Sequence, residues 1–312
     1  MHSGMRVGSP VLRVSNIDKI LEFYEKKLGL QVKRRHKEDN DGSLICELGF
    51  NDVGQTEESL LQLQHDPNAE NASPHSAGLF HFAILVPDRK SLASTYLALK
   101  DSGVHYDGFA DHLVSESLYL RDPENNGIEI YHDRPARDWP RDFEGNIMMD
   151  TLPLNLQSIV SEIDRAESEN TVAFPTGARI GHMHLKVTNL ARSIKFYHEK
   201  LGLDITVDWT SMGAAFLSAG GYHHHVGMNT WHSRNGEGHR DNVLGLENFT
   251  IAIPDTSFFS RLRSAIKNHY VSSEWHQGEQ RYYENQFMVS DPDGIHVVVR
   301  SEGEEHIQYS YS

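Results

Sequence analysis

Residues 9–30 read SPVLRVSNIDKILEFYEKKLGL, and residues 182–203 read HMHLKVTNLARSIKFYHEKLGL. The two stretches align without a gap, and both end in Phe-Tyr, three further residues and Leu-Gly-Leu. Each copy predicts a short strand, a Ser/Thr-Asn turn and a helix. Gly29 and Gly202 fit the left-handed residue that ends a helix. The apolar positions of the first copy fall at helical spacing, at Ile17, Ile20, Leu21, Tyr24 and Leu28.

A second pair of stretches follows the first. HFAILVPD (81–88) matches NFTIAIPD (248–255), and each leads through Pro-Asp into an amphipathic helix. Strands around an Asp-Pro turn then close each unit, in 121–131 and 290–300. The chain is therefore predicted to hold four similar units, each with a strand, a helix and three strands. These units span roughly residues 8–66, 77–133, 179–232 and 244–301.

The units group into two halves. Residues 1–133 are predicted to form an N-terminal module and residues 179–312 a C-terminal module. Residues 134–178 are predicted to be a linker, because they carry several prolines and an acidic stretch at 161–169.

Charge and cysteine content exclude several classes of partner and site. The 29 Lys and Arg residues against 44 Asp and Glu give a net charge of −15, which disfavours nucleic acid and anionic membranes. Cys46 is the single cysteine, so no intrachain disulfide can form. With no long apolar run and no signal-peptide core at the N-terminus, we expect a cytoplasmic protein. The 20 histidines make a metal site built from His and carboxylates the natural expectation.

The repeated strand-helix signature ending in FYxxxLGL resembles the vicinal-oxygen-chelate superfamily. Glyoxalase I, bleomycin-resistance proteins and extradiol ring-cleavage dioxygenases belong to that superfamily. The resemblance covers nearly the whole chain outside the linker. It implies an α+β fold of four βαβββ units that form paired open barrels. In such units the first and last strands can each present a metal ligand, so function is argued from those positions.

Units one and four offer poor ligands at these positions. In unit one the first strand presents Ser9, and the last strand offers Gln62 and Gln64. In unit four the two positions hold Asn248 and Val298. Both units are therefore predicted to bind no metal.

Units two and three retain ligands. Unit two presents His81 and Glu129, and unit three presents His182, which follows a glycine as the superfamily pattern requires. His184 is expected on the same face as His182. Glu129 alternates with apolar residues, and burying a carboxylate there costs free energy unless it is paired or bound to a cation. Taken alone, the pattern fits equally well a buried Glu with hydrogen-bond partners or an exposed Glu on an edge strand. Two His and one carboxylate form the facial triad of non-haem Fe(II) oxygenases, and Mn(II) accepts the same ligands.

Unit two carries a longer motif that begins at His112, HLVSESLYLRDPENNGIE. The motif resembles the signature of type I extradiol dioxygenases and departs from it at Ala110 and Asn125. The resemblance implies that Glu129 ligates iron and that His112 and Tyr119 line the substrate pocket. Without the resemblance, ordinary strand packing would be the better interpretation of both side chains.

The last strand of unit three reads GGYHHHVGMNTW (220–231). In a strand either His223 and His225 or His224 alone would face inward. The resemblance implies that one of them is an acid–base catalyst. His225 fits the pattern best, with His224 or His223 in reserve, and at least one of the three is expected to be a packing residue.

Neither half holds all three ligands, so units two and three are predicted to pair, either within one chain or across a dimer. Units one and four would form the partner barrel without a metal. The resemblance extends to the bacterial catechol 2,3-dioxygenases and implies extradiol (meta) ring cleavage of a catechol-type substrate by dioxygen, in a homo-oligomer. The alternatives are a metal-dependent glyoxalase-type isomerase or lyase and a non-catalytic small-molecule binding protein.

Overall fold

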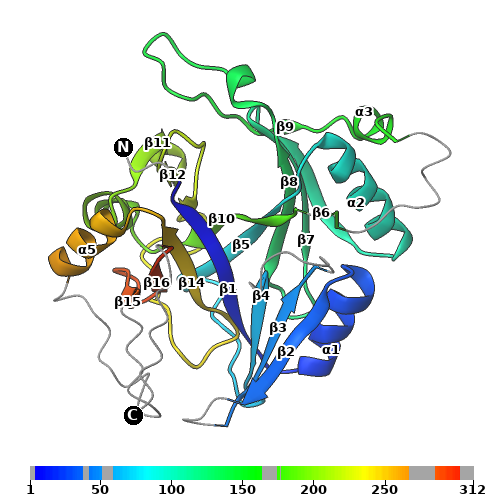
Figure 1. The fold of residues 1–312 in the computed structure, drawn as a ribbon, viewed down its shortest axis with the longest axis horizontal. Coiled ribbons are helices and arrows are strands. Elements are labelled where there is room, and N and C mark those ends of the chain that lie inside the picture. The colour runs from blue at the N-terminus through cyan, green and yellow to red at the C-terminus, as the bar shows by residue number, and fades with distance from the viewer. Residues whose placement is uncertain are drawn as a thin grey trace, which may run out of the picture.

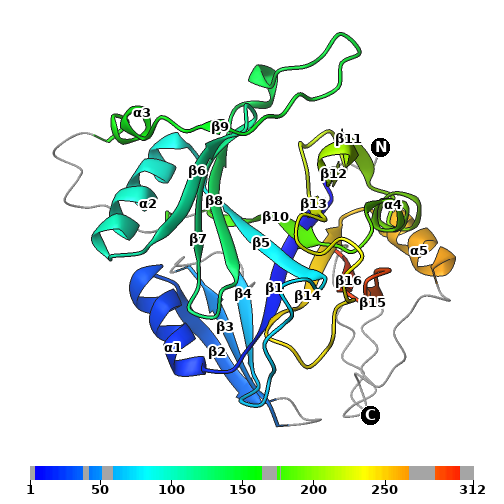
Figure 2. The ribbon, with the colours of Figure 1, turned by 180° about the vertical axis from the view of Figure 1, so that it is seen from behind.

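A computed structural model describes residues 4–37, 42–50, 59–163, 174–175, 177–266 and 285–302. The described chain forms two curled β-sheets with short helices on their outer faces (Figures 1 and 2). Most of the predicted acidic stretch 161–169 lies outside the described residues. Within the part of the chain that the structure describes, no helix has the length and apolar character needed to cross a membrane.

The first sheet has seven strands and combines units one and four. Unit one supplies β1 (Arg6–Val14), β2 (Gln31–Lys37), β3 (Leu44–Gly49) and β4 (Leu61–His65). Unit four supplies β14 (Gly245–Ile253), β15 (Gln286–Ser290) and β16 (His296–Ser301). The strand order is β15-β16-β14-β1-β4-β3-β2, and β1 and β14 pair antiparallel at the join.

The second sheet has nine strands and combines units two and three within one chain. Unit two supplies β5 (Gly78–Leu85), β6 (Tyr106–Asp111), β7 (Ser115–Arg121) and β8 (Gly127–Asp133). Unit three supplies β10 (Arg179–Lys186), β11 (Asp204–Trp209), β12 (Ala214–Ser218) and β13 (Val226–Asn229). The order is β11-β12-β13-β10-β5-β8-β7-β6-β9, where β9 is Leu152–Pro153.

Each unit carries one helix after its first strand. These helices are α1 (Ile17–Glu22), α2 (Arg89–Asp101), α4 (Leu190–Lys195) and α5 (Thr256–Ala265). A fifth helix, α3 (Leu156–Val160), lies beside α2 (Figure 1). The described residues also include short helical turns: η1 (Phe23–Lys27), η2 (Ala136–Asp138), η4 (Phe196–Lys200) and η5 (Thr210–Met212). Residues 267–284, between α5 and β15, lie outside the described residues.

The repeated signature folds as predicted at both ends of its helix. Asn16 caps α1 by accepting a hydrogen bond from the Lys19 backbone N–H at 3.0 Å, and Asn189 caps α4 in the same way. Gly29 and Gly202 have φ of 73° and 78°, the left-handed conformation that favours glycine. The physical role of the signature is thus to start and stop a short helix.

The tyrosine of each FYxxxLGL motif joins two units. Tyr24 donates a hydrogen bond to Asp122 Oδ2 at 3.1 Å, and Tyr197 donates one to Asp291 Oδ2 at 3.3 Å. All four side chains are buried. The first of these bonds links units one and two, and the second links units three and four. The shared sheets link the remaining pairs, units two and three and units four and one. The four units therefore form a closed cycle of contacts.

The predicted linker is partly built into the sheet. Its strand β9 pairs with β6, and the segment between β8 and β9 projects from the body of the molecule at the top of Figure 1. Phe143 on that segment is 98% exposed.

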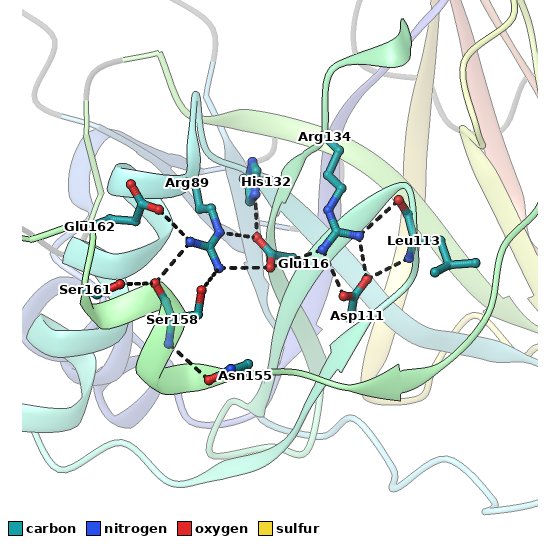
Figure 3. Close-up of polar contacts among 10 residues, drawn as sticks. All are labelled: Arg89, Asp111, Leu113, Glu116, His132, Arg134, Asn155, Ser158, Ser161 and Glu162. Atoms are coloured by element: carbon teal, nitrogen blue, oxygen red, sulfur yellow. Dashed lines mark hydrogen bonds and ion pairs between the residues drawn. The ribbon is translucent and has the colours of Figure 1, made fainter. Parts of the chain in front are cut away.

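A network of charges fastens α2 and α3 to the second sheet (Figure 3). Glu116 on β7 accepts from Arg89 Nε at 2.7 Å and from His132 Nε2 at 2.9 Å, and it lies 3.3 Å from Arg134. Arg89 also binds the Ser158 carbonyl and hydroxyl on α3. Burial alone would raise the pKa of the Glu116 carboxyl, but His132 and Arg89 lower it to about 2.

Candidate metal centre and its cavity

The centre of the second sheet brings the predicted ligands together in one row. His182 on β10 is paired with Ala83 on β5, and Ala83 is paired with Glu129 on β8. Adjacent strands lie about 4.8 Å apart, so β8 and β10 are separated by about 10 Å. The small side chain of Ala83 lets Glu129 Oε2 come within 3.0 Å of His182 Nε2. His81 Nε2 lies 2.9 Å from the same oxygen.

This cluster fits a divalent first-row metal ion. Its three ligand atoms all lie within 4.8 Å of one another, and the residues are 6% (His81), 3% (Glu129) and 1% (His182) exposed. Two neighbouring ligand atoms, each about 2.1 Å from one ion, would lie about 3.0 Å from each other. The distances from Glu129 Oε2 to the two histidine nitrogens are close to this value. His81 Nε2 is buried and makes no hydrogen bond within the described residues, although it lies so close to the carboxylate. An ion shared by the three side chains would satisfy that nitrogen.

The electrostatics favour the protonation states that a metal needs. Burial opposes ionisation of Glu129, but the two histidines outweigh it and hold the pKa of the Glu129 carboxyl well below its usual value. Burial lowers the pKa of His182 to about 4, despite the opposing charge of Glu129. A carboxylate and a neutral imidazole are therefore available at neutral pH.

Two glycines beside the ligands make room for close packing. A Cβ at Gly181 would lie 1.8 Å from the Tyr131 hydroxyl, and a Cβ at Gly127 would lie 2.1 Å from the Phe80 carbonyl oxygen. The glycine that precedes His182 is thus required because Tyr131 crosses over it.

His81 and Glu129 open into a cavity of about 360 Å³. Its lining combines aromatic rings with polar groups, which include His112, Tyr119, His184 and His224. The aromatic lining residues are Phe80, Trp209, Phe216 and Trp231. Asp107 and Arg121 also line it and pair with each other at 2.7 Å. Such a cavity suits a planar apolar ring that carries a few polar groups.

His112 and Tyr119, predicted from the longer motif, form a pair on the cavity wall. The Asp150 carbonyl lies 2.8 Å from His112 Nδ1 and can only accept, so Nδ1 carries a proton. In neutral His112 the Nε2 then accepts from the Tyr119 hydroxyl at 2.7 Å. Burial and the charge of Glu129 raise the pKa of Tyr119 well above its usual value, so its hydroxyl stays protonated.

The prediction that His223, His224 and His225 lie in a strand is wrong, because β13 begins only at Val226. His224 lines the cavity, and its ring centroid lies 4.0 Å from that of His182. His225, the preferred catalyst, is not among the lining residues; its Nδ1 bonds the Ser218 hydroxyl at 2.8 Å. His223 is fully buried and bonds Asp133.

The corresponding positions of the first sheet bring no metal cluster together within the described residues. The Ser9 hydroxyl donates to the Ser59 carbonyl, and Gln62 and Gln64 bond hydroxyls of Ser59 and Ser43.

Several cavity residues were not identified from the sequence. The aromatic lining residues and Asp107, Arg121, Met149 and Thr151 come from strands and loops without a distinctive spacing. Met149 and Thr151 belong to the predicted linker, where no signal pointed to a site.

Comparisons with known proteins match most of the chain. The family model described as Glyoxalase/Bleomycin resistance protein/Dioxygenase superfamily matches residues 6–130 and 179–299. A catechol-2,3-dioxygenase of Bacillus subtilis is 36% identical over 293 residues, covering 94% of this chain and 95% of that protein.

Solved structures share the fold. A crystal structure of a dioxygenase, described as putative, from Bacillus subtilis has a TM-score of 0.62 at 13% identity, covering 95% of this chain and 84% of that one. Glyoxalase I from Zea mays has a TM-score of 0.53 at 18% identity, covering 96% of this chain and 92% of that one. At these identities the two structures show a common fold alone.

Proposed function

The chain belongs to the glyoxalase/bleomycin resistance protein/dioxygenase superfamily, and within it we propose that the chain is an extradiol dioxygenase. It would cleave the ring of a catechol with dioxygen at an Fe(II) ion held by His81, Glu129 and His182. The buried cluster of these three side chains, of which His81 and Glu129 line the cavity, carries the proposal. The 36% identity to the Bacillus subtilis catechol-2,3-dioxygenase supports it.

The donor set suits the chemistry. Two imidazoles and one carboxylate would hold an Fe(II) ion and would leave coordination positions for both hydroxyls of a catechol and for dioxygen. Bound Fe(II) would lower the pKa of the substrate hydroxyls and provide a path for electrons between substrate and oxygen. Mn(II) accepts the same ligands.

The protein's own residues would orient the substrate and move its protons. The aromatic lining residues Phe80, Trp209, Phe216 and Trp231 would pack against the ring and exclude water. His224 lines the cavity beside His182 and would accept a proton from a catechol hydroxyl and return it later. His112 and Tyr119 would hydrogen-bond oxygen atoms on which negative charge develops. His225 remains a predicted catalyst without a contact to the cavity.

The direct test loads the protein anaerobically with Fe(II) and then adds catechol and oxygen. Ring cleavage should consume one dioxygen per catechol and yield a yellow 2-hydroxymuconic semialdehyde. If neither oxygen uptake nor the yellow product appears with any of several ring-substituted catechols, the proposal is wrong.

A glyoxalase-type isomerase would favour four protein ligands, commonly with two carboxylates. The described cluster has three ligands, of which one is a carboxylate. Turnover of a methylglyoxal–thiol adduct with Ni(II) or Zn(II), without oxygen uptake, would identify that activity. Tight binding of a small molecule without turnover would identify a binding protein. The homo-oligomer and the cytoplasmic location remain predictions, and light scattering tests the first.

A further inference from the structure

A chain of hydrogen bonds leads from the cavity to the partly exposed side chain of Asp133. His224 Nδ1 lies 2.7 Å from His223 Nδ1, and His223 Nε2 lies 2.7 Å from Asp133 Oδ1. Asp133 Oδ2 accepts a further bond from the Tyr222 hydroxyl at 3.0 Å. Tyr131 lies 2.7 Å from Tyr222, oxygen to oxygen, and donates to it because Tyr222 donates to Asp133.

The Asp133 carboxylate, at the end of this series of hydrogen bonds, determines which nitrogen of each histidine carries a proton. Asp133 only accepts, so His223 must carry its proton on Nε2. In neutral His223 the Nδ1 is then an acceptor, and His224 must donate to it from its own Nδ1. His224 is left with a lone pair on Nε2, a nitrogen that no hydrogen bond engages among the described residues.

The surroundings hold this arrangement still. His223 is fully buried, with the rings of Tyr222 and Trp139 at 4.1 Å and 5.3 Å between centroids. The Trp139 Nε1–H donates to the Arg134 carbonyl at 2.7 Å, which fixes the indole. A buried imidazole clamped between two rings keeps one orientation, so the tautomer is not free to exchange by ring rotation.

We propose that Asp133 and His223 are positioning residues that fix His224 as the Nδ1–H tautomer, with Nε2 ready to take the proton of a substrate hydroxyl. The substrate O–H bond breaks, an Nε2–H bond forms on His224, and the resulting imidazolium donates through Nδ1 to His223. The negative charge of Asp133 stabilises that cation through His223. The proposal rests on the proposed function for the identity of the substrate, but the tautomer itself does not depend on turnover.

The test replaces the carboxylate by an isosteric amide, Asp133→Asn. Because the Tyr222 hydroxyl donates to the other oxygen position of residue 133, the amide oxygen should face Tyr222 and the NH2 should face His223. The NH2 then donates to His223 Nε2, which moves the His223 proton to Nδ1 and leaves His224 as the Nε2–H tautomer. With the base blocked, kcat should fall by about 10²-fold or more, while KM for catechol and the iron content hold. Asp255→Asn is the matched control, because Asp255 caps α5 away from the cavity and Asn caps equally well.

The second readout is the tautomer, measured in metal-free full-length protein labelled with ¹⁵N at histidine, from two-bond ¹H–¹⁵N couplings. The proposal requires an Nδ1–H His224 in the wild-type protein and an Nε2–H His224 in Asp133→Asn. An Nε2–H His224 in the wild type would overturn it, as would an unchanged kcat in a folded, iron-loaded Asp133→Asn. If the variant does not fold, the wild-type tautomer alone decides. If the wild type shows no ring cleavage, the proposed function fails while this readout still decides the inference.

Discussion

At the scale of single residues, the candidate metal cluster depends on the small side chain of Ala83. Glu129 and His182 stand on strands that are not neighbours and meet across this one methyl group. Ala83 itself is fully buried, so a larger side chain has no route to solvent.

We expect Ala83→Leu to separate Glu129 from His182 and to remove most of the bound iron. Overpacking should also cost about 1–3 kcal/mol in the free energy of unfolding. Ala93→Leu is the matched control, since Ala93 is equally buried in α2 but away from the cluster. Metal analysis and denaturant unfolding of both variants measure the effect, and an iron content as high in Ala83→Leu as in Ala93→Leu would contradict it.

His182→Ala removes one of the three proposed ligands. We expect loss of both stoichiometric iron and catechol turnover, because two remaining ligands hold the ion poorly. His198→Ala on η4, where the ring bonds a backbone carbonyl, should leave both unchanged. Full iron content in His182→Ala, by elemental analysis, would show that the ion is bound elsewhere.

Positions can be counted from the sequence where regular strands determine which way a side chain faces. His81, Glu129 and His182 lie in β5, β8 and β10, where the superfamily positions could be counted along the repeats. The three adjacent histidines could not be resolved in this way because they precede β13 in an irregular segment. Strand alternation does not apply there, and hydrogen bonds to Asp133 and Ser218 decide the orientation instead.

At the scale of elements, short helices depend on polar contacts for their attachment to the sheets. The Glu116 network attaches both α2 and α3, and Glu116 is 4% exposed (Figure 3). The strands and capped helices of the repeat could be predicted from spacing, but this network could not. Its members come from β6, β7, β8, α2 and α3 and have no common pattern along the chain.

Glu116→Gln should lower the free energy of unfolding by about 1–3 kcal/mol at neutral pH, because the partly buried Arg89 and the buried His132 lose their anionic acceptor. In the wild type this contribution is present above the ordinary glutamate pKa of 4.5. It is lost as the pH falls toward about 2, the folded-state pKa. The difference in stability between variant and wild type should therefore shrink across that interval.

Urea unfolding of both proteins at several pH values measures this. Glu22→Gln is the control, since Glu22 is exposed and pairs with Lys26 on the helix surface. If the difference in free energy of unfolding between Glu116→Gln and the wild type stays constant down to pH 3, the Glu116 carboxylate does not make this contribution.

At the scale of the whole molecule, the proposed metal would join the two halves of the chain. His81 and Glu129 belong to the N-terminal half and His182 to the C-terminal half, within one chain. Units two and three share a sheet, as predicted. The sequence left open whether they pair within a chain or between chains, because ligand positions alone carry no information on connectivity.

Removing the metal should therefore destabilise the protein as a whole. At a free Fe(II) concentration 1,000 times the Kd, binding adds about 4 kcal/mol to the free energy of unfolding, or roughly 5–10 °C in Tm. Anaerobic calorimetry with and without a chelator measures the shift. Glu129→Gln should show little shift, and an equal shift in that variant would place the stabilising ion at another site.

The pairing of β1 with β14 has a consequence for synthesis on the ribosome. Val11 and Asn248 are register partners about 240 residues apart. At about 5–20 residues per second, β1 waits roughly 10–50 s for its neighbour to be made. Until then the edge of β1 that β14 will cover has unpaired backbone groups, which are available to other chains. The nascent N-terminal half should therefore depend on chaperones, and its yield should fall when translation slows before β14.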